Sequence, residues 1–142
     1  MRQAKSKGTM ILLDHGPVFK LAKLNAFGPE SLKNKRFEMW WQSMFEQWAF
    51  TLDMVIWLEA PDTILKERIN TREQRHVVKE RSEEEAYQFL ASYRRSYEQI
   101  MAKLRDNDGP TLLKFDTYQT SIDQIVDEVM TACDLTLSEN LN

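Results

Sequence analysis

Positively charged side chains gather in one short stretch of the sequence. The segment RINTREQRHVVKER, residues 68–81, holds four arginines, one lysine and one of the two histidines, in a chain whose formal net charge is -3. Arginine offers paired donors to paired phosphate oxygens and does not lose its charge, so the segment is suited to bind phosphate. We call residues 68–81 the flap, and we expect it to stabilise a phosphoryl group in transfer while its closure excludes water.

The same charges have a simpler interpretation. Acidic residues lie in and around the flap, including Glu67, Glu73, Glu80 and the run 83–85. Charged segments of this kind are commonly solvated faces, and exposed ion pairs contribute little to stability. The composition of the flap alone therefore leaves both interpretations open, a ligand-binding segment and a solvated loop.

Asp14 is a candidate for the acid–base or metal chemistry of phosphoryl transfer. It ends an apolar run and is followed by His15, Gly16 and Pro17. A carboxylate at the end of a strand can hold Mg²⁺ through water or accept a proton from an attacking hydroxyl. Gly16 permits close approach of the backbone or a positive φ at the turn. The plainer alternative is that Asp14 caps the turn or helix that follows.

The composition is that of an ordinary globular protein. A length of 142 residues, with 42% hydrophobic and 29% charged residues, suits a single domain over residues 1–142. No apolar run reaches the roughly 18 residues of a membrane span, and the start MRQAKSKGTM lacks the apolar centre of a signal peptide. One cysteine, Cys133, cannot form an internal disulfide, so we expect a reducing compartment and a cytoplasmic protein.

Strands and helices alternate along the predicted chain. Apolar runs predict strands near 9–14, 54–59 and 111–116. Apolar residues at spacings of three and four predict helices over about 29–51, 61–69, 83–106 and 122–133. Ser82 and Glu85 have the spacing of a capping box at the start of the third helix. We expect the tail, residues 135–142, to be frayed.

This alternation predicts the fold class and the position of a ligand. Strands joined by helices of this length indicate βαβ crossovers and a parallel sheet. We therefore predict an α/β fold with three layers, in which helices cover both faces of a short sheet of about three parallel strands and the flap forms a helical lid. Ligands of such sheets bind beyond the carboxyl ends of the strands, where Asp14 and Asp116 lie.

The order of these segments resembles the P-loop kinases of the thymidylate kinase and deoxynucleoside kinase type. The motifs that carry the resemblance are LLDHGP, MVIWLEAPDTILKERINTREQRH, EEEAYQFLASYRRSYEQI and LLKFDTYQTSIDQIVDEV. They cover roughly residues 9–134, and the part from Val55 to Tyr97 is the most specific. The resemblance implies a P-loop NTPase-like fold, ATP and Mg²⁺ as cofactors, and phosphoryl transfer from ATP to a nucleoside, nucleotide or similar small molecule.

The resemblance also implies roles for the charged residues singled out above. Asp14 would assist the attacking group or hold Mg²⁺ through water. Arg68 and Arg72 would contact the phosphates of the donor or stack near its adenine. Arg75 would be a further cation of the lid, and His15 stands at the position that faces the acceptor.

Two further segments receive roles from the resemblance. The loop DTYQTS, which begins with Asp116, Thr117 and Tyr118, would border the adenine of the donor. Arg36, Trp40 and Trp41 lie on the helix that lines the acceptor pocket or forms a dimer face in the family. For the two tryptophans the plain alternative is an aromatic stripe in the core or at a dimer interface.

The chain departs from the family pattern in two places. His15 stands where the family usually has arginine. No G-x-x-x-x-G-K-[ST] motif occurs, and the scattered glycines, Gly8, Gly16, Gly28 and Gly109, do not form one. The backbone cradle and lysine that hold the phosphates of the donor are therefore missing. We expect the corresponding strands to lie upstream of Met1, and we expect the isolated chain to be weakly active or inactive.

The sequence leaves alternatives to catalysis open. The family places a further strand between those at 9–14 and 54–59, so we expect this chain to depart from the family sheet order or to associate. The flap could hold a nucleotide or another anion without turnover. The chain could form a homodimer through the aromatic helix 29–51 or through the open sheet. The acidic total and the run 83–85 argue against nucleic acid as a partner.

Overall fold

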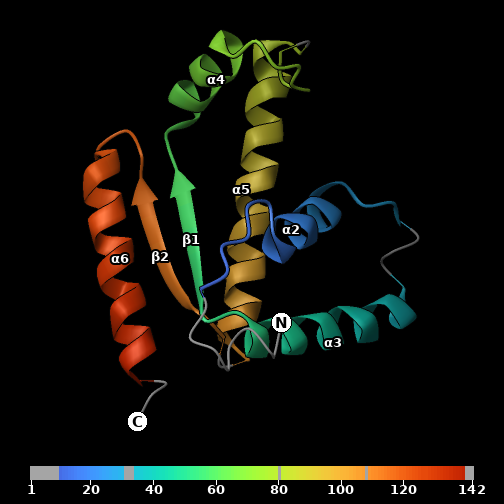
Figure 1. The fold of residues 1–142 in the computed structure, drawn as a ribbon. Coiled ribbons are helices and arrows are strands. Elements are labelled where there is room, and N and C mark those ends of the chain that lie inside the picture. Colours follow the sequence, from blue (N-terminus) through green and yellow to red (C-terminus); the bar gives the residue numbers. More distant parts are fainter. Residues whose placement is uncertain (1–9, 31–33, 80, 108, 140–142) are drawn as a thin grey trace.

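The chain is described here by a computed structural model, which covers residues 10–30, 34–79, 81–107 and 109–139. Helices and strands alternate in the part that follows residue 53, which gives the mixed α/β structure that the sequence predicts (Figure 1). The elements are α2 (Pro17–Phe27), α3 (Lys35–Thr51), β1 (Met54–Glu59), α4 (Asp62–Thr71), α5 (Glu83–Arg105), β2 (Thr111–Asp116) and α6 (Ile122–Glu139).

β1 and β2 form a parallel pair, which confirms two of the three predicted strands. Their register runs from Met54 opposite Thr111 to Glu59 opposite Asp116. The hydrogen bonding continues past the strand end, where the Thr117 N–H donates to the Glu59 carbonyl at 2.8 Å. A parallel pair needs a long crossover, and α4, the remainder of the flap and α5 supply it.

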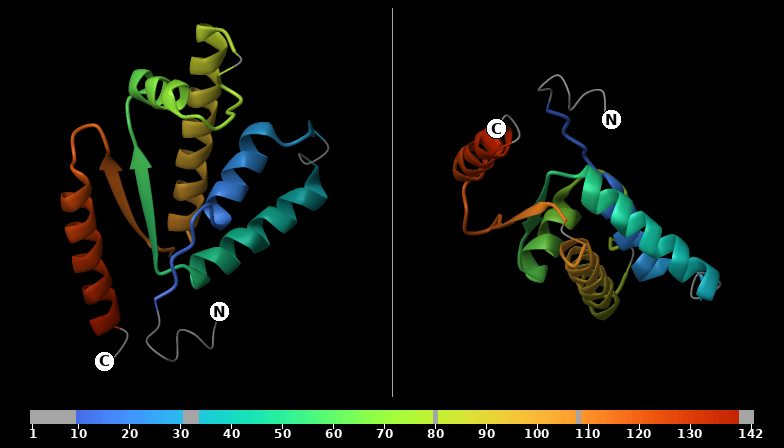
Figure 2. Two further views of the ribbon diagram at one scale, coloured as in Figure 1. Left: turned by 45° about the horizontal axis from the view of Figure 1, so that its top comes forward. Right: turned by 90° about the horizontal axis from the view of Figure 1, so that it is seen from below.

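Helices lie on both sides of this pair. Figures 1 and 2 show α6 on one side of the strands and α5, with α2 and α3 beyond it, on the other. Val55, Trp57 and Leu112 pack against the core on the α5 side. The apolar face of α6 is only partly covered, because Val126 and Met130 remain about half exposed.

The core forms where α5 crosses α2 and α3. Its buried members are Leu21, Ala22, Phe45, Ala49, Ile100, Met101 and Leu104. A buried polar contact reinforces the α2–α5 crossing: the Ser96 hydroxyl donates to the Ala22 carbonyl at 2.7 Å and accepts from the Asn25 amide at 2.9 Å. Because this buried hydroxyl both donates and accepts a hydrogen bond, the cost of removing it from water is offset at the crossing.

The predicted strand at 9–14 is wrong for its described residues, 10–14. They are irregular or turn residues, and the large side chains from Met10 to Leu13 are between 44% and 79% exposed. A strand is stabilised by hydrogen bonds to a neighbouring strand, and no described strand pairs with this segment. Thr9 lies outside the described residues.

The turn before α2 also differs from the expectation. Gly16 has φ -65°, and His15 takes the positive φ, 48°. A left-handed conformation costs a residue with a side chain about 1 kcal/mol. α2 itself was not predicted from the sequence, although Pro17 stands at its first position, where proline is favoured.

The bounds of two predicted helices need correction. α3 begins at Lys35, after the cap Asn34, whereas the prediction began near residue 29. α6 continues to Glu139, so residues 135–139 of the predicted frayed tail are helical, and 140–142 lie outside the described residues. Within the described ranges, no helix combines the length and the apolar character needed to cross a membrane.

The turn from α5 into β2 requires glycine. A Cβ atom at Gly109 would lie 2.1 Å from the Leu104 carbonyl oxygen, a backbone atom that cannot rotate away. We expect Gly109→Ala to lower the free energy of unfolding by about 1–3 kcal/mol, measured by urea denaturation. Gly16→Ala is the control, because its nearest contact is 3.2 Å, to the Leu13 side chain. Equal effects of the two substitutions would contradict this reading of the turn.

Candidate functional site

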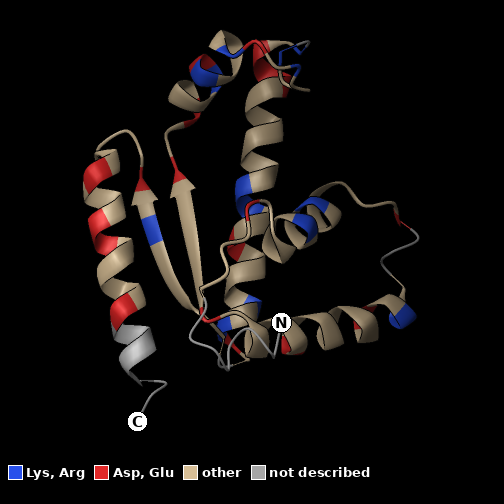
Figure 3. Ribbon diagram, viewed as in Figure 1, with Lys and Arg blue, Asp and Glu red and all other residues tan. Residues whose placement is uncertain are grey.

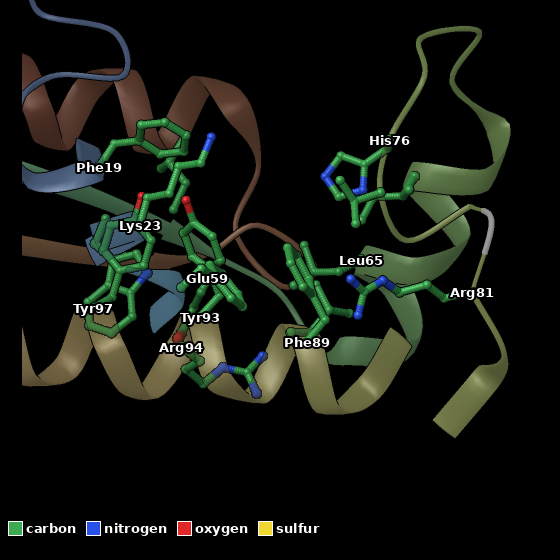
Figure 4. A pocket seen from close by; sticks show the side chains of 16 residues that line it. Phe19, Lys23, Glu59, Leu65, His76, Arg81, Phe89, Tyr93, Arg94 and Tyr97 are labelled. Atoms are coloured by element: carbon green, nitrogen blue, oxygen red, sulfur yellow. The ribbon is translucent and has the colours of Figure 1, made fainter. Parts of the chain in front are cut away.

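A pocket of about 590 Å³ lies beyond the carboxyl end of β1. Residues of α2, α4, the flap and α5 surround it, together with the last residues of β1 (Figure 4). Its volume is in the range of small-molecule sites. It reaches the carboxyl end of β1, as expected for the α/β fold class, but neither Asp14 nor Asp116 lines it. It is therefore the candidate functional site.

Aromatic side chains form the walls of the pocket. They are Phe19, Phe27, Trp57, Phe89, Tyr93 and Tyr97. Phe27 and Phe89 stack with ring centroids 4.8 Å apart, and Trp57 and Tyr97 stack at 5.9 Å. Burial, with Tyr93 beside it, raises the pKa of Tyr97 to about 12, so its hydroxyl stays neutral at physiological pH. Such walls suit a flat, uncharged ring system.

The flap contributes two nitrogen-bearing side chains to the pocket. Figure 4 shows His76 and Arg81 on the side opposite Phe19 and Lys23. The Arg81 guanidinium lies 5.2 Å from the centre of the Phe89 ring, a cation–π contact that orients it. The flap therefore closes one side of the pocket, and it brings positive charge there.

Local contacts hold the flap in this position. The Val78 N–H donates to His76 Nδ1 at 3.2 Å, and the Val78 side chain is buried. Lys79 donates through Nζ to the carbonyl of Arg72, which ties the two ends of the loop together. Burial, and to a lesser degree Arg72 and Lys79, lowers the pKa of His76 below 6.5. His76 is thus neutral at pH 7 and can accept this hydrogen bond.

Some of the remaining polar residues of the pocket already form hydrogen bonds or ion pairs within the protein, and others do not. Arg94 donates to both carboxylate oxygens of Asp62, at 2.6 and 3.2 Å, and to the Ala60 carbonyl at 3.1 Å. Glu59 forms an ion pair with Lys114 at 3.0 Å. The Lys23 ammonium group has no hydrogen bond or ion pair with another described residue. Lys23 and Arg81 are therefore the cations best placed to meet an anionic ligand.

Arg68 and Thr117, predicted to bind the nucleotide, contact each other. The Arg68 guanidinium donates to Thr117 Oγ1 at 2.7 Å and to the Thr117 carbonyl at 3.0 Å. The Thr117 hydroxyl in turn donates to the Glu59 carbonyl at 2.9 Å. This chain of hydrogen bonds joins α4 to the carboxyl ends of both strands, and Arg68 does not line the pocket.

The other residues predicted to bind the donor lie around this junction. Arg72 follows the last residue of α4 and is exposed, as is Arg75 in the loop beyond it. Asp116 accepts a hydrogen bond from the Tyr118 N–H at 2.9 Å, which shapes the turn after β2, and the Tyr118 side chain is exposed. None of these four residues lines the pocket.

The predicted acid and its neighbour lie beside the pocket. Asp14 is 94% exposed and lies 3.6 Å from the His15 ring nitrogen Nδ1. The His15 ring packs on Phe19 with centroids 4.5 Å apart, and Phe19 lines the pocket. The turn before α2 therefore brings His15 against a lining residue of the pocket, and Asp14 lies next to His15; neither residue lines the pocket.

The residues predicted to bind the acceptor on α3 are not brought to the pocket. Trp40 and Trp41 are in contact with each other, with ring centroids 5.5 Å apart, and Trp41 stacks on the buried Phe45 at the same distance. Arg36 is exposed near the start of α3. Trp41 thus extends the core, as in the plainer of the two interpretations, whereas Trp40 is 40% exposed.

The sequence singled out the flap, which supplies His76 and Arg81, but not the other residues that form the pocket. Phe19, Lys23 and Phe27 belong to α2, the unpredicted helix, where their spacing of four places them on one face. Phe89 and Tyr93 belong to the apolar stripe that predicts the helix 83–106. In the carboxyl-terminal half of α5 this stripe packs in the core, and in the amino-terminal half it lines the pocket. The sequence pattern is the same in both halves, so it does not distinguish pocket residues from core residues.

No family model, curated protein or solved structure matches the chain. Among the described residues, no group of three or more histidine, cysteine, aspartate or glutamate side chains has a geometry that could hold a metal ion.

Substitution of Arg68 and of Arg72 tests whether the hydrogen bonds between Arg68 and Thr117 stabilise the fold. Arg68→Ala removes two hydrogen bonds of a charged donor at the end of the sheet, so we expect the free energy of unfolding to fall by about 1–3 kcal/mol. Arg72→Ala leaves the backbone carbonyl that Lys79 contacts, so its effect should stay within about 0.5 kcal/mol. Urea denaturation of both variants measures the difference. If Arg68→Ala leaves the free energy of unfolding unchanged, the hydrogen bonds between Arg68 and Thr117 do not stabilise the fold.

The lowered pKa of His76 predicts a pH dependence of stability. Below pH 6.5 the unfolded chain takes up this proton more readily than the folded chain, so the free energy of unfolding should fall as the pH drops from 6.5 toward the folded pKa. Glu83 and Glu85 titrate below 4.5, outside that window. His76→Asn keeps an acceptor for the Val78 N–H and should flatten the profile between pH 5 and 6.5. An unchanged profile would contradict the assignment.

Proposed function

We propose that the pocket binds a nucleoside or nucleotide and that the chain takes part in ATP-dependent phosphoryl transfer to it. The observation that supports this proposal is the combination of stacked aromatic walls with two cations, Lys23 and Arg81, at the carboxyl end of a parallel strand. The aromatic walls favour a flat base, and the cations favour a phosphate group. The resemblance of the sequence to nucleoside and nucleotide kinases supports the same ligand class.

The arrangement favours one orientation of the ligand. The base would lie against the wall formed by Phe27, Phe89 and Tyr93, whose rings contact one another with centroids 4.8–5.8 Å apart. The phosphate or the acceptor hydroxyl would then face Lys23 on one side of the pocket or Arg81 on the other, the two cations without an ion pair among its described residues. Asp14, next to His15, would position the attacking group, and it could hold Mg²⁺ together with water and the phosphate oxygens.

Charge on the flap supports phosphate as part of the ligand. Figure 3 shows lysine and arginine on α4 and the flap, above the acidic carboxyl ends of the two strands. Arg72 and Arg75 are exposed on the flap, so a further closure of the loop would bring them toward a bound phosphate. Arg68 would instead act as a positioning residue, since it joins α4 to Thr117.

Binding without turnover is the second candidate. The sequence has no G-x-x-x-x-G-K-[ST] motif to cradle the phosphates of a donor, which favours a chain that holds a nucleotide and does not transfer its phosphate. Production of ADP from ATP and Mg²⁺ in the presence of a nucleoside separates the two candidates. A bound nucleotide with no ADP above background would support the binding module.

The nucleotide proposal is tested by removing the two pocket cations. We expect Lys23→Ala and Arg81→Ala to weaken binding of thymidine monophosphate roughly tenfold to a hundredfold, because each removes a charge-assisted contact, as measured by isothermal titration calorimetry. Binding of thymidine, which has no phosphate, should change less.

The control is Arg105→Ala, which removes one positive charge from the exposed carboxyl end of α5, away from the pocket. It should bind thymidine monophosphate like the unsubstituted chain. If all three variants bind equally well, the ligand does not occupy this pocket. Binding of no nucleoside or nucleotide at millimolar concentration would exclude the proposed ligand class.

A further inference from the structure

One edge of β1 has no partner strand in the described structure. The carbonyl groups of Asp53 and Glu59 accept hydrogen bonds from β2, so alternate residues between them direct their backbone groups to the opposite edge. These residues are Met54, Ile56 and Leu58. No hydrogen bond joins their outward N–H and carbonyl groups to another described residue.

The two outer edges of the sheet differ in chemistry. At the middle of the β2 edge stands Lys114, whose ammonium group contacts Glu59 and lies 4.5 Å from the centre of the Trp57 ring. Charged residues, lysine above all, protect edge strands from pairing with another chain. β1 has no charge between Met54 and Leu58, and its sequence MVIWL is apolar on both faces. The unprotected edge is therefore that of β1.

An exposed apolar segment lies on the same side. Figures 1 and 2 show residues 10–13 on the side of β1 that faces away from β2. The side chains of Met10, Ile11, Leu12 and Leu13 are all at least 44% exposed, and Leu58 is 56% exposed. A further strand added at this edge would remove these apolar side chains from water, which is favourable.

We propose that this edge of β1 binds an extended apolar strand of a partner polypeptide. The outward backbone groups specify a strand, because a helix would leave them without hydrogen bonds. Apolar residues on both faces of β1 specify a strand that is apolar on both faces. The carboxylate of Asp14, which follows the apolar segment 10–13 beside this edge and is 94% exposed, specifies a basic residue next to the partner strand. This proposal does not depend on nucleotide binding in the pocket.

The test uses a fluorescein-labelled peptide, Lys-Val-Ile-Val-Ile-Val-Lys, whose binding is followed by fluorescence anisotropy. We expect saturable binding to the unsubstituted chain. Ile56→Pro removes the outward N–H of β1 and leaves its hydrogen bonds with β2 intact, so affinity should fall at least tenfold. Lys114→Pro removes an outward N–H of the β2 edge and is the matched control, which should bind as before.

A second variant guards against a folding defect in Ile56→Pro. Leu58→Lys places a charge at an already exposed position of the same edge, and it should also reduce peptide binding at least tenfold. Circular dichroism confirms that each variant remains folded. Equal binding by Ile56→Pro and Lys114→Pro, or no binding to the unsubstituted chain, would overturn the proposal. A dimer in light scattering that Ile56→Pro dissociates would also overturn it, because a second copy would then occupy the edge.

Discussion

The parallel pairing of β1 with β2 is the interaction on which the arrangement of the other elements depends. Two parallel strands cannot be joined by a tight turn, so α4, the flap and α5 are carried across the sheet in one long connection. The register then brings Glu59 and Asp116 side by side, and Thr117 follows immediately. Thr117 joins the Glu59 carbonyl to Arg68, which ties the start of the flap to the end of the sheet.

α5 connects the core to the candidate site. Its carboxyl-terminal half buries Ile100 and Leu104 against α2 and α3, whereas its amino-terminal half presents Phe89 and Tyr93 to the pocket. The Ser82–Glu85 capping box fixes where the helix begins, and therefore where the flap ends. A rigid helix shared in this way holds the aromatic walls in place, while the flap between α4 and α5 is held mainly by local contacts.

The sequence predicted helices and strands more accurately than it predicted which side chains contact one another. The capping box, the helix after it and the strands 54–59 and 111–116 are as expected, because each depends on local spacing. Among the flap cations, the structure brings Arg81 to the pocket and Arg68 to Thr117. Both are arginines in one short segment, and only the path of the loop decides which ligand or side chain each one meets.

Composition and the periodicity of apolar residues were sufficient to predict the α/β class and to locate the cationic flap. The tertiary structure alone decided that residues 10–14 are not a strand, because an apolar run becomes a strand only where a neighbour accepts its hydrogen bonds. It also decided that Phe19 and Lys23 of α2 face Phe89 of α5 across one pocket. Residues this far apart in the sequence meet through packing, which spacing along the chain does not encode.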